Sequence, residues 1–104
     1  MKNKLFYLLT LSVLLLAQDT TQNGKKVFET YCWGCHHQTA VAFGPPFNEI
    51  AAKRSAQEIE AYIISPKSMY KSFGYKRTVM TQFDLNNSER KLVTQYILSF
   101  KGKK

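Results

Sequence analysis

The chain has 104 residues, with 15 Lys and Arg against 7 Asp and Glu, and only two cysteines. This length indicates one domain. If a leader carrying Lys2 and Lys4 is removed, 13 basic residues remain against the same 7 acidic ones, which gives a net charge of +6. That balance fits a solvated lysine-rich surface or a docking face for acidic proteins. Nucleic acid is not expected as a partner of an exported chain.

Residues 1–17 have the pattern of a secretory signal peptide. A short basic start precedes an almost wholly apolar run, Leu5–Leu16, and Ala17 offers a small residue for cleavage. The cut is expected after Ala17 or after Gln18, which leaves residues 18–104 as the mature domain. The apolar run is too short to cross a bilayer comfortably, so membrane attachment is expected only if this segment stays uncleaved as an anchor.

A helix is predicted from Gly24, after the polar residues 19–23, which can cap it. Glycine inside a helix is costly unless another element packs closely against it, so we expect the C-terminal helix to cross at Gly24. The apolar side chains that follow recur at helical spacing, at Val27, Phe28, Tyr31 and Cys32.

This helix runs into the pentapeptide Cys32-Trp33-Gly34-Cys35-His36, which has the c-type haem attachment pattern. Two thiols held two residues apart can each add across a vinyl group on one edge of a haem. The adjacent imidazole of His36 can then bind the iron as the proximal ligand. The pattern therefore predicts one covalent haem c, attached through Cys32 and Cys35.

Three other uses of these residues compete with haem attachment. A zinc site needs four ligands, commonly in two spaced pairs, whereas Cys32, Cys35, His36 and His37 all fall within six residues. A thioredoxin-like redox motif needs a βαβ context, and no clear strand pattern flanks this one. A disulfide can form in an exported chain, but it leaves His36 without a role.

A loop after the motif is marked by Gly44-Pro45-Pro46-Phe47. The two prolines fix the backbone and lack N–H donors, so their neighbourhood leaves carbonyl groups free to accept. A proximal histidine commonly donates its other ring N–H to a backbone carbonyl. Pro45 is our candidate acceptor for His36, and a rigid turn without that role is the alternative.

A second helix is predicted over Ser55–Ser65. Ser55 and Glu58 have the spacing of a capping box, and Ser65-Pro66 stops the helix. Residues 67–79 show no clear period. We interpret them as a loop that covers the other face of the haem and ends at Met80.

The last helix is predicted to begin near Asn86, capped by the pair Asn86 and Glu89. Gly102 can end it, with lysines nearby at the negative end of the helix dipole. Its apolar stripe consists of Leu92, Val93, Tyr96, Ile97 and Phe100.

The sixth iron ligand decides the chemistry. A methionine thioether raises the potential and closes the coordination sphere, whereas an open position permits ligand binding or peroxide chemistry. Met69 and Met80 remain after the leader is removed. We favour Met80, because it lies late in the loop where the chain must cover the distal face, and Met69 is the alternative. His37 is expected to be exposed or hydrogen-bonded to backbone, because its neighbour already occupies the proximal side.

The mature sequence resembles a small bacterial class I (monohaem) cytochrome c over almost its whole length. The resemblance implies an all-α fold, with three to four helices around a covalently bound haem and the N- and C-terminal helices crossing. The family often has proline directly after the ligand methionine, whereas Thr81 stands here. The residues that carry the resemblance are Gly24–Phe28, Cys32–His36, Gly44-Pro45, Pro66, Met80, Leu85-Asn86 and Tyr96-Ile97.

Carried over by position, Cys32 and Cys35 resemble the thioether pair and His36 resembles the proximal ligand. Pro45 resembles the carbonyl acceptor and Met80 the distal ligand. Gly24 and Tyr96 resemble the contact between the crossing helices.

The resemblance implies electron transfer without a substrate reaction, so the chain is expected to be a carrier rather than an enzyme. A soluble periplasmic carrier that docks on an acidic oxidase or peroxidase is the favoured interpretation. A haem subunit of a periplasmic dehydrogenase, for example of the sulfite dehydrogenase type, is the alternative. A haem ligand sensor or minor peroxidase is a lesser one.

Overall fold

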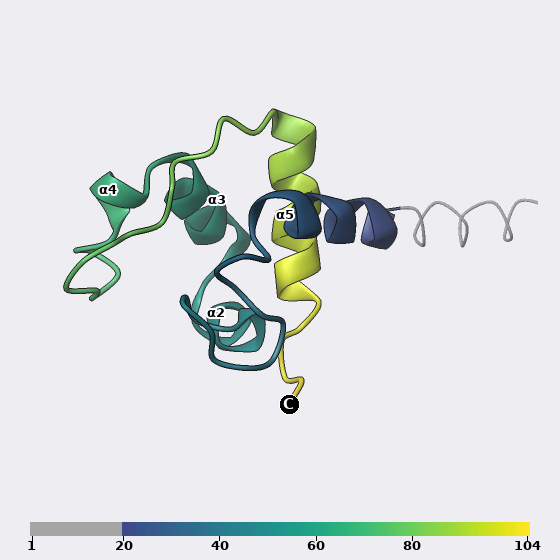
Figure 1. The fold of residues 1–104 in the computed structure, drawn as a ribbon, viewed down its shortest axis with the longest axis horizontal. Helices are drawn as coiled ribbons and strands as arrows, with labels where there is room; N and C mark the ends of the chain where they lie inside the picture. Colours follow the sequence, from purple (N-terminus) through teal and green to yellow (C-terminus); the bar gives the residue numbers. More distant parts are fainter. Residues whose placement is uncertain (1–19) are drawn as a thin grey trace, which may run out of the picture.

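The computed structural model describes residues 20–104, and the leader expected over residues 1–17 lies outside them. The described part of the chain is all-α, as expected, and contains no strand. Within it, no helix combines the length and the hydropathy that a membrane crossing requires. Its elements are an N-terminal helix described over residues 20–31, α2 (Phe47–Lys53), α3 (Ala56–Ile64), α4 (Pro66–Met69) and α5 (Asn87–Leu98) (Figure 1).

The N-terminal helix lies across α5, as the sequence predicted (Figure 1). A Cβ atom built on Gly24 would lie 2.5 Å from the backbone oxygen of Leu92 and 2.9 Å from Cβ of Tyr96. Distances under 3 Å leave no room for a side chain. Gly24 is therefore required at the crossing, because only glycine allows the two backbones to come this close.

The core of the domain is built on aromatic rings from three different helices. Phe28 of the N-terminal helix lies 5.0 Å from Phe47 of α2 and 5.5 Å from Tyr96 of α5, between ring centroids. Phe28, Phe47 and Tyr96 are all buried. Edge-on and tilted ring pairs at these separations stabilise a core beyond the area that they bury. The other buried apolar residues of this core are Val27, Ile59, Ile63, Leu85, Val93 and Ile97.

Both predicted capping boxes are present. The Ser55 hydroxyl accepts a hydrogen bond from the Glu58 amide, and the Ser55 amide donates to the Glu58 carboxylate, which starts α3. Asn86 and Glu89 make the same reciprocal pair at the start of α5. Each pair satisfies backbone donors that the first helical turn leaves without a partner.

The helix ends differ from the predictions at two places. The N-terminal helix already includes residues 20–23, which were expected to cap it, while Asp19 lies outside the described residues. At the other end of the chain, α5 stops at Leu98, and turns carry the backbone on to Gly102, which has a φ of +78°. Gly102 therefore ends the turn that follows α5 rather than the helix itself.

Two short helices were not predicted, so there are five helical segments in the described residues where three to four were expected. α2 has seven residues, and Pro46 at its N-cap gives no side-chain hydrogen bond, so no capping signal marks its start. Residues 67–69 of α4 lie inside the stretch that was predicted to be a loop. Pro66 ends α3 but also occupies the first turn of α4, where its missing N–H costs nothing.

We predict that Gly24→Ala destabilises the haem-loaded protein. Alanine in place of glycine inside a helix normally gains about 1 kcal/mol, but here the new methyl group meets the Leu92 carbonyl of a packed helix. Overpacking should outweigh the propensity gain and lower the free energy of unfolding by about 1–3 kcal/mol, measured by denaturant titration. Asn23→Ala, at the preceding exposed position, is the control and should be neutral or slightly stabilising. A stabilised Gly24→Ala protein would contradict the close crossing.

Candidate functional site

The pentapeptide at residues 32–36 forms a turn directly after the N-terminal helix. The carbonyl of Phe28 accepts from the amides of Cys32 (2.8 Å) and Trp33 (3.0 Å). The carbonyl of Cys32 accepts in turn from the amides of Cys35 (3.1 Å) and His36 (2.9 Å). These bonds fix the backbone on which both cysteines and the histidine are carried.

Both cysteines are free thiols, so the structure does not have the disulfide considered as an alternative. Cys35 is exposed, whereas Cys32 is half-buried and packs against the hydrophobic core. Burial, and secondarily the neighbouring Cys35, raises the pKa of Cys32 to about 11. At neutral pH Cys32 is therefore an uncharged thiol, which its apolar surroundings favour over a thiolate.

The imidazole of His36 is oriented by the hydrogen bond predicted from the sequence. Its Nδ1 lies 2.8 Å from the carbonyl oxygen of Pro45. A carbonyl oxygen can only accept, so Nδ1 must carry the proton and donate it. In the neutral ring Nε2 then presents a lone pair, which is the form that binds a metal ion.

Gly44 and Phe47 hold the same ring from two sides. The Gly44 amide donates to the carbonyl of Cys35 at 2.6 Å, which folds the loop back on the motif. A Cβ atom on Gly44 would lie 2.5 Å from Cε1 of His36, so only glycine leaves room for the imidazole. Phe47 stacks on His36, with the ring centroids 5.6 Å apart and the planes inclined by 29°. The ring is thus fixed in position as well as in tautomer.

His37 is exposed and hydrogen-bonded to backbone, as predicted. Its Nδ1 accepts from the amides of Thr39 and Ala40, each at 3.1 Å. Nowhere in residues 20–104 do three His, Cys, Asp or Glu side chains form a group that could hold a metal ion. The ligand set that a zinc site would need is therefore not assembled around Cys32 and Cys35.

Both candidate methionines are half-buried, but they lie in different elements. Met80 is half-buried and packs against the hydrophobic core, as Cys32 and Phe83 also do. Its amide donates to Oγ1 of Thr78 at 3.4 Å. Met69 is the last residue of α4. The structure thus places Met80, like Cys32, at the edge of the core.

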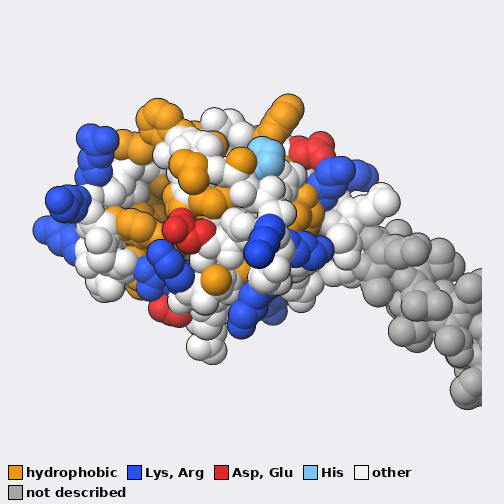
Figure 2. Space-filling view, turned by 90° about the horizontal axis from the view of Figure 1, so that it is seen from below, with side chains coloured by type: hydrophobic (Ala, Val, Ile, Leu, Met, Phe, Trp, Pro, Cys, Tyr) orange, Lys and Arg blue, Asp and Glu red, His pale blue; other side chains and the backbone are white. Residues whose placement is uncertain are grey.

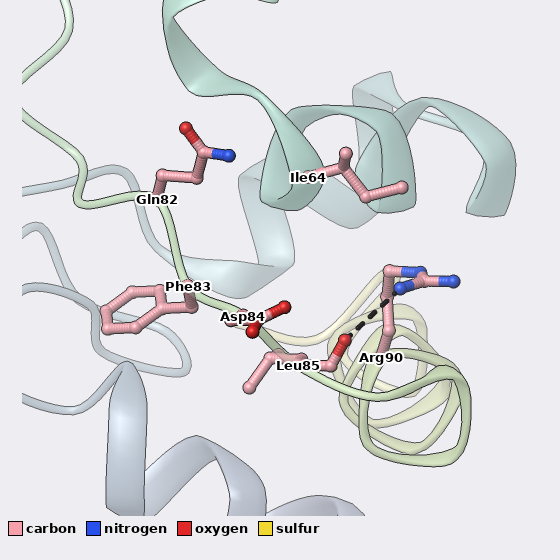
Figure 3. Close-up of a pocket in the computed structure, with 6 residues that line it drawn as sticks. All are labelled: Ile64, Gln82, Phe83, Asp84, Leu85 and Arg90. Carbon is pink, nitrogen blue, oxygen red and sulfur yellow. Dashed lines mark hydrogen bonds between the residues drawn. The ribbon is translucent and has the colours of Figure 1, made fainter.

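Two hollows lie in the described surface. One, of about 280 Å³, lies beside the motif and is lined by Phe28, Glu29, Trp33 and Gln38. The other, of about 380 Å³, lies between the end of α3 and the start of α5 (Figure 3). Arg90 in this second hollow donates to the carbonyl of Leu85 at 3.4 Å. Its lining (Ile64, Gln82, Phe83, Asp84, Leu85 and Arg90) contains no His, Cys or Met that could bind iron.

A profile of the cytochrome c family matches residues 21–101. The chain belongs to the cytochrome c family. Searches of curated proteins and of solved structures returned no match. Membership of this family implies a covalently bound haem c and a function in electron transfer.

The residues of this cytochrome c fit a haem c on three observations. Two free thiols stand on one turn, at the spacing that attachment requires. The adjacent imidazole has its Nδ1 satisfied by Pro45, which leaves Nε2 for iron. The glycine at position 44 leaves space for that ring and for no side chain of its own.

Some contributors to the site were not identified as such from the sequence. Gly44 and Phe47 were noted only as parts of a proline-rich landmark, and their contacts with His36 depend on how the loop folds back. The contacts that hold the segment before Met80 were missed as well. Tyr62 bonds Thr78, 16 positions away, and Arg54 bonds Phe73, 19 positions away, and pairs so far apart leave no periodic signal in the sequence.

We predict that Gly44→Ala disturbs the His36 imidazole. The added methyl group must displace the ring or the loop, which should lower the free energy of unfolding of the haem-loaded protein by about 1–3 kcal/mol. A weakened Nδ1–H···O bond makes the imidazole less basic, so the reduction potential should rise in a spectroelectrochemical titration. Gly34→Ala adds the same methyl group where no atom lies within 4 Å and serves as the control. An unchanged potential in Gly44→Ala would show that the ring is not confined by this loop.

Proposed function

We propose that this cytochrome c is an exported bacterial carrier of one haem, with His36 and Met80 as its axial ligands. The observation that carries the proposal is the hydrogen bond between His36 Nδ1 and the Pro45 carbonyl, 2.8 Å long, beside two free thiols. It leaves Nε2 as the free nitrogen of a ring that cannot turn, because Gly44 and Phe47 hold it on two sides. Cys32 and Cys35 would form the thioether bonds.

Met80 is supported as the second ligand by its place at the core. It packs on the same hydrophobic cluster as Cys32, so the attachment turn and this side chain share one core. A thioether ligand favours reduced iron and leaves no open coordination position. That combination suits a carrier, which must exchange electrons without binding a substrate.

The haem, when bound, supplies reversible one-electron exchange. The chain's own residues do the rest: Cys32 and Cys35 fix the group, and His36 is oriented before iron is bound. The aromatic core around Phe28 and Phe47 excludes water behind the imidazole. A carrier of this kind converts no substrate of its own, because it only exchanges electrons with partner proteins.

The charge of the chain supports a diffusing carrier that meets acidic redox proteins, such as an oxidase or a peroxidase. Figure 2 shows a face on which Lys and Arg side chains lie on both sides of exposed hydrophobic ones, with few acidic groups. A basic surface of this kind raises the rate of encounter with an acidic partner, and salt reduces that rate. The signal-peptide pattern of residues 1–17 supports a periplasmic location.

A second candidate is the haem subunit of a periplasmic dehydrogenase, such as one of the sulfite dehydrogenase type. The observation in its favour is a set of exposed apolar side chains close to the motif in the chain. Trp33 is 65% exposed, Val41 86% and Phe43 79%. The bond between the Gly44 amide and the Cys35 carbonyl brings the end of the 41–44 stretch against the attachment turn. Exposed apolar side chains that gather in one patch are typical of a lasting protein interface.

Size-exclusion chromatography of a native periplasmic extract, followed by the absorbance of the reduced haem, separates the two candidates. A diffusing carrier elutes at the size of one small domain and is oxidised rapidly by added membranes. A subunit elutes with a much larger protein and is reduced only when the substrate of that protein is supplied. Absence of the protein from the periplasmic extract would contradict both.

We predict that Met80→Ala opens the sixth coordination position. The reduced variant should bind carbon monoxide stoichiometrically, and its reduction potential should fall, because the thioether that favours reduced iron is gone. Optical titration with carbon monoxide and spectroelectrochemistry measure the two effects. Met69→Ala is the matched control and should behave as the wild type. The reverse result would identify Met69 as the ligand, and carbon monoxide binding by the wild type would support a ligand sensor instead.

A further inference from the structure

Arg54, between α2 and α3, binds the segment that leads to Met80. Its Nη2 donates to the carbonyl of Phe73 at 2.8 Å, and its Cζ lies 4.0 Å from the centroid of the Phe73 ring. Its Nη1 lies 3.7 Å from a carboxylate oxygen of Glu58. The Arg54 side chain is only 19% exposed, so these contacts are partly shielded from water. We call residues 70–80 the distal segment, and Arg54 binds it at Phe73.

The distal segment has a second attachment, on α3. The Tyr62 ring lies 5.2 Å from the Phe73 ring and 6.0 Å from the Tyr75 ring. The Tyr62 hydroxyl donates to Oγ1 of Thr78 at 3.1 Å, and the same oxygen accepts from the Met80 amide. A continuous set of contacts therefore joins Arg54, through two aromatic rings and the hydroxyls of Tyr62 and Thr78, to the backbone of Met80.

These side-chain contacts matter because the distal segment lacks regular structure of its own. Its backbone forms a turn, in which the Phe73 amide donates to Met69 and the Tyr75 amide to Tyr70, with Gly74 at a φ of +87°. Residues 77–86 are neither helical nor extended in a sheet. The position of Met80 therefore depends on what holds the segment from outside.

The geometry at Phe73 requires an arginine. Nε of Arg54 is buried and has no hydrogen-bond partner among the described residues, so the guanidinium is held by its ring stack and by its two terminal nitrogens. A planar guanidinium can stack on a ring and donate to a carbonyl beside it at the same time. The ammonium of a lysine is a point charge and cannot do both.

We propose that Arg54 is a positioning residue for the sixth ligand: by stacking on Phe73 and bonding its carbonyl, it holds the distal segment closed and limits the exchange of Met80 for external ligands. The inference rests on the proposed ligation by His36 and Met80. Arg54 acts through Phe73 and is assigned no contact with iron.

The test measures imidazole binding to the ferric, haem-loaded protein, because imidazole must displace the sixth ligand. If the open state is more populated, the apparent affinity rises in proportion. Arg54→Lys should bind imidazole roughly tenfold more tightly than the wild type, the effect expected from losing a charge-assisted hydrogen bond and a ring stack. Arg77→Lys, the same change at an exposed position of the distal segment, should leave the affinity unchanged.

A double-mutant cycle shows whether Arg54 acts through Phe73. Phe73→Leu removes the ring but keeps the backbone carbonyl, so in that background Arg54→Lys should lose only the hydrogen bond and have a smaller effect than it has in the wild type. Fully additive effects, or an Arg54→Lys affinity equal to that of the wild type, would overturn the proposal. The fraction of ferric protein with the thioether-to-iron absorption band should fall in parallel, which a merely structural loss far from the iron would not produce.

Met80→Ala in the same titration separates this proposal from the one on which it rests. An unchanged imidazole affinity in Met80→Ala would refute Met80 as the ligand and the role of Arg54 with it. A raised affinity in Met80→Ala with no effect of Arg54→Lys would refute the role of Arg54 alone.

Native-state hydrogen exchange of the unaltered haem-loaded protein tests the proposal without any variant, so the test still holds if a variant does not fold. The amides of Phe73 and Tyr75 should open together, at lower denaturant than those of α5, and at a rate that matches imidazole entry. If these amides exchange only through global unfolding, the distal segment does not open independently of the rest of the fold, and the proposal is refuted.

Discussion

The hydrogen bond between His36 and the Pro45 carbonyl is the constraint on which this site depends. Because a carbonyl can only accept, one bond of 2.8 Å fixes both the tautomer and the direction of the imidazole. Other residues of the loop keep the imidazole in the position that this bond requires. Gly44 removes the side chain that would occupy the space of the ring, and Phe47 supports its face. The two prolines hold the carbonyl in place without adding donors that would need partners of their own.

The same residues also build the fold. Phe47 begins α2, stacks on His36 and contacts Phe28, and Phe28 contacts Tyr96 beside the crossing at Gly24. The imidazole is therefore backed by the interior that joins the first and last helices, and not by a separate pocket wall. In a domain of this size few rings are available for the core, so one ring serves both stability and the site.

Much of this arrangement follows from local rules, and the remainder does not. The pentapeptide, the capping boxes at Ser55 and Asn86 and the crossing at Gly24 each depend on residues a few positions apart or on one costly glycine. α2 was missed because its start carries no side-chain cap, and α4 was missed because Pro66 was interpreted only as a stop. The contacts of Arg54 and Tyr62 with the distal segment join residues far apart in the chain, and no pattern in the sequence marks such pairs.

The two sides of the site are held by different means. On the side of His36, backbone hydrogen bonds, a missing side chain and a ring stack hold the imidazole, and attachment through Cys32 and Cys35 would be covalent. On the side of Met80, a segment without regular structure is held by a guanidinium, two rings and a hydroxyl. Contacts of the second kind can open without unfolding the helices behind them, because few of them lie in the core. In the proposed ligation, the Met80 thioether is consequently the ligand that this fold can release, and the His36 imidazole is the one that it retains.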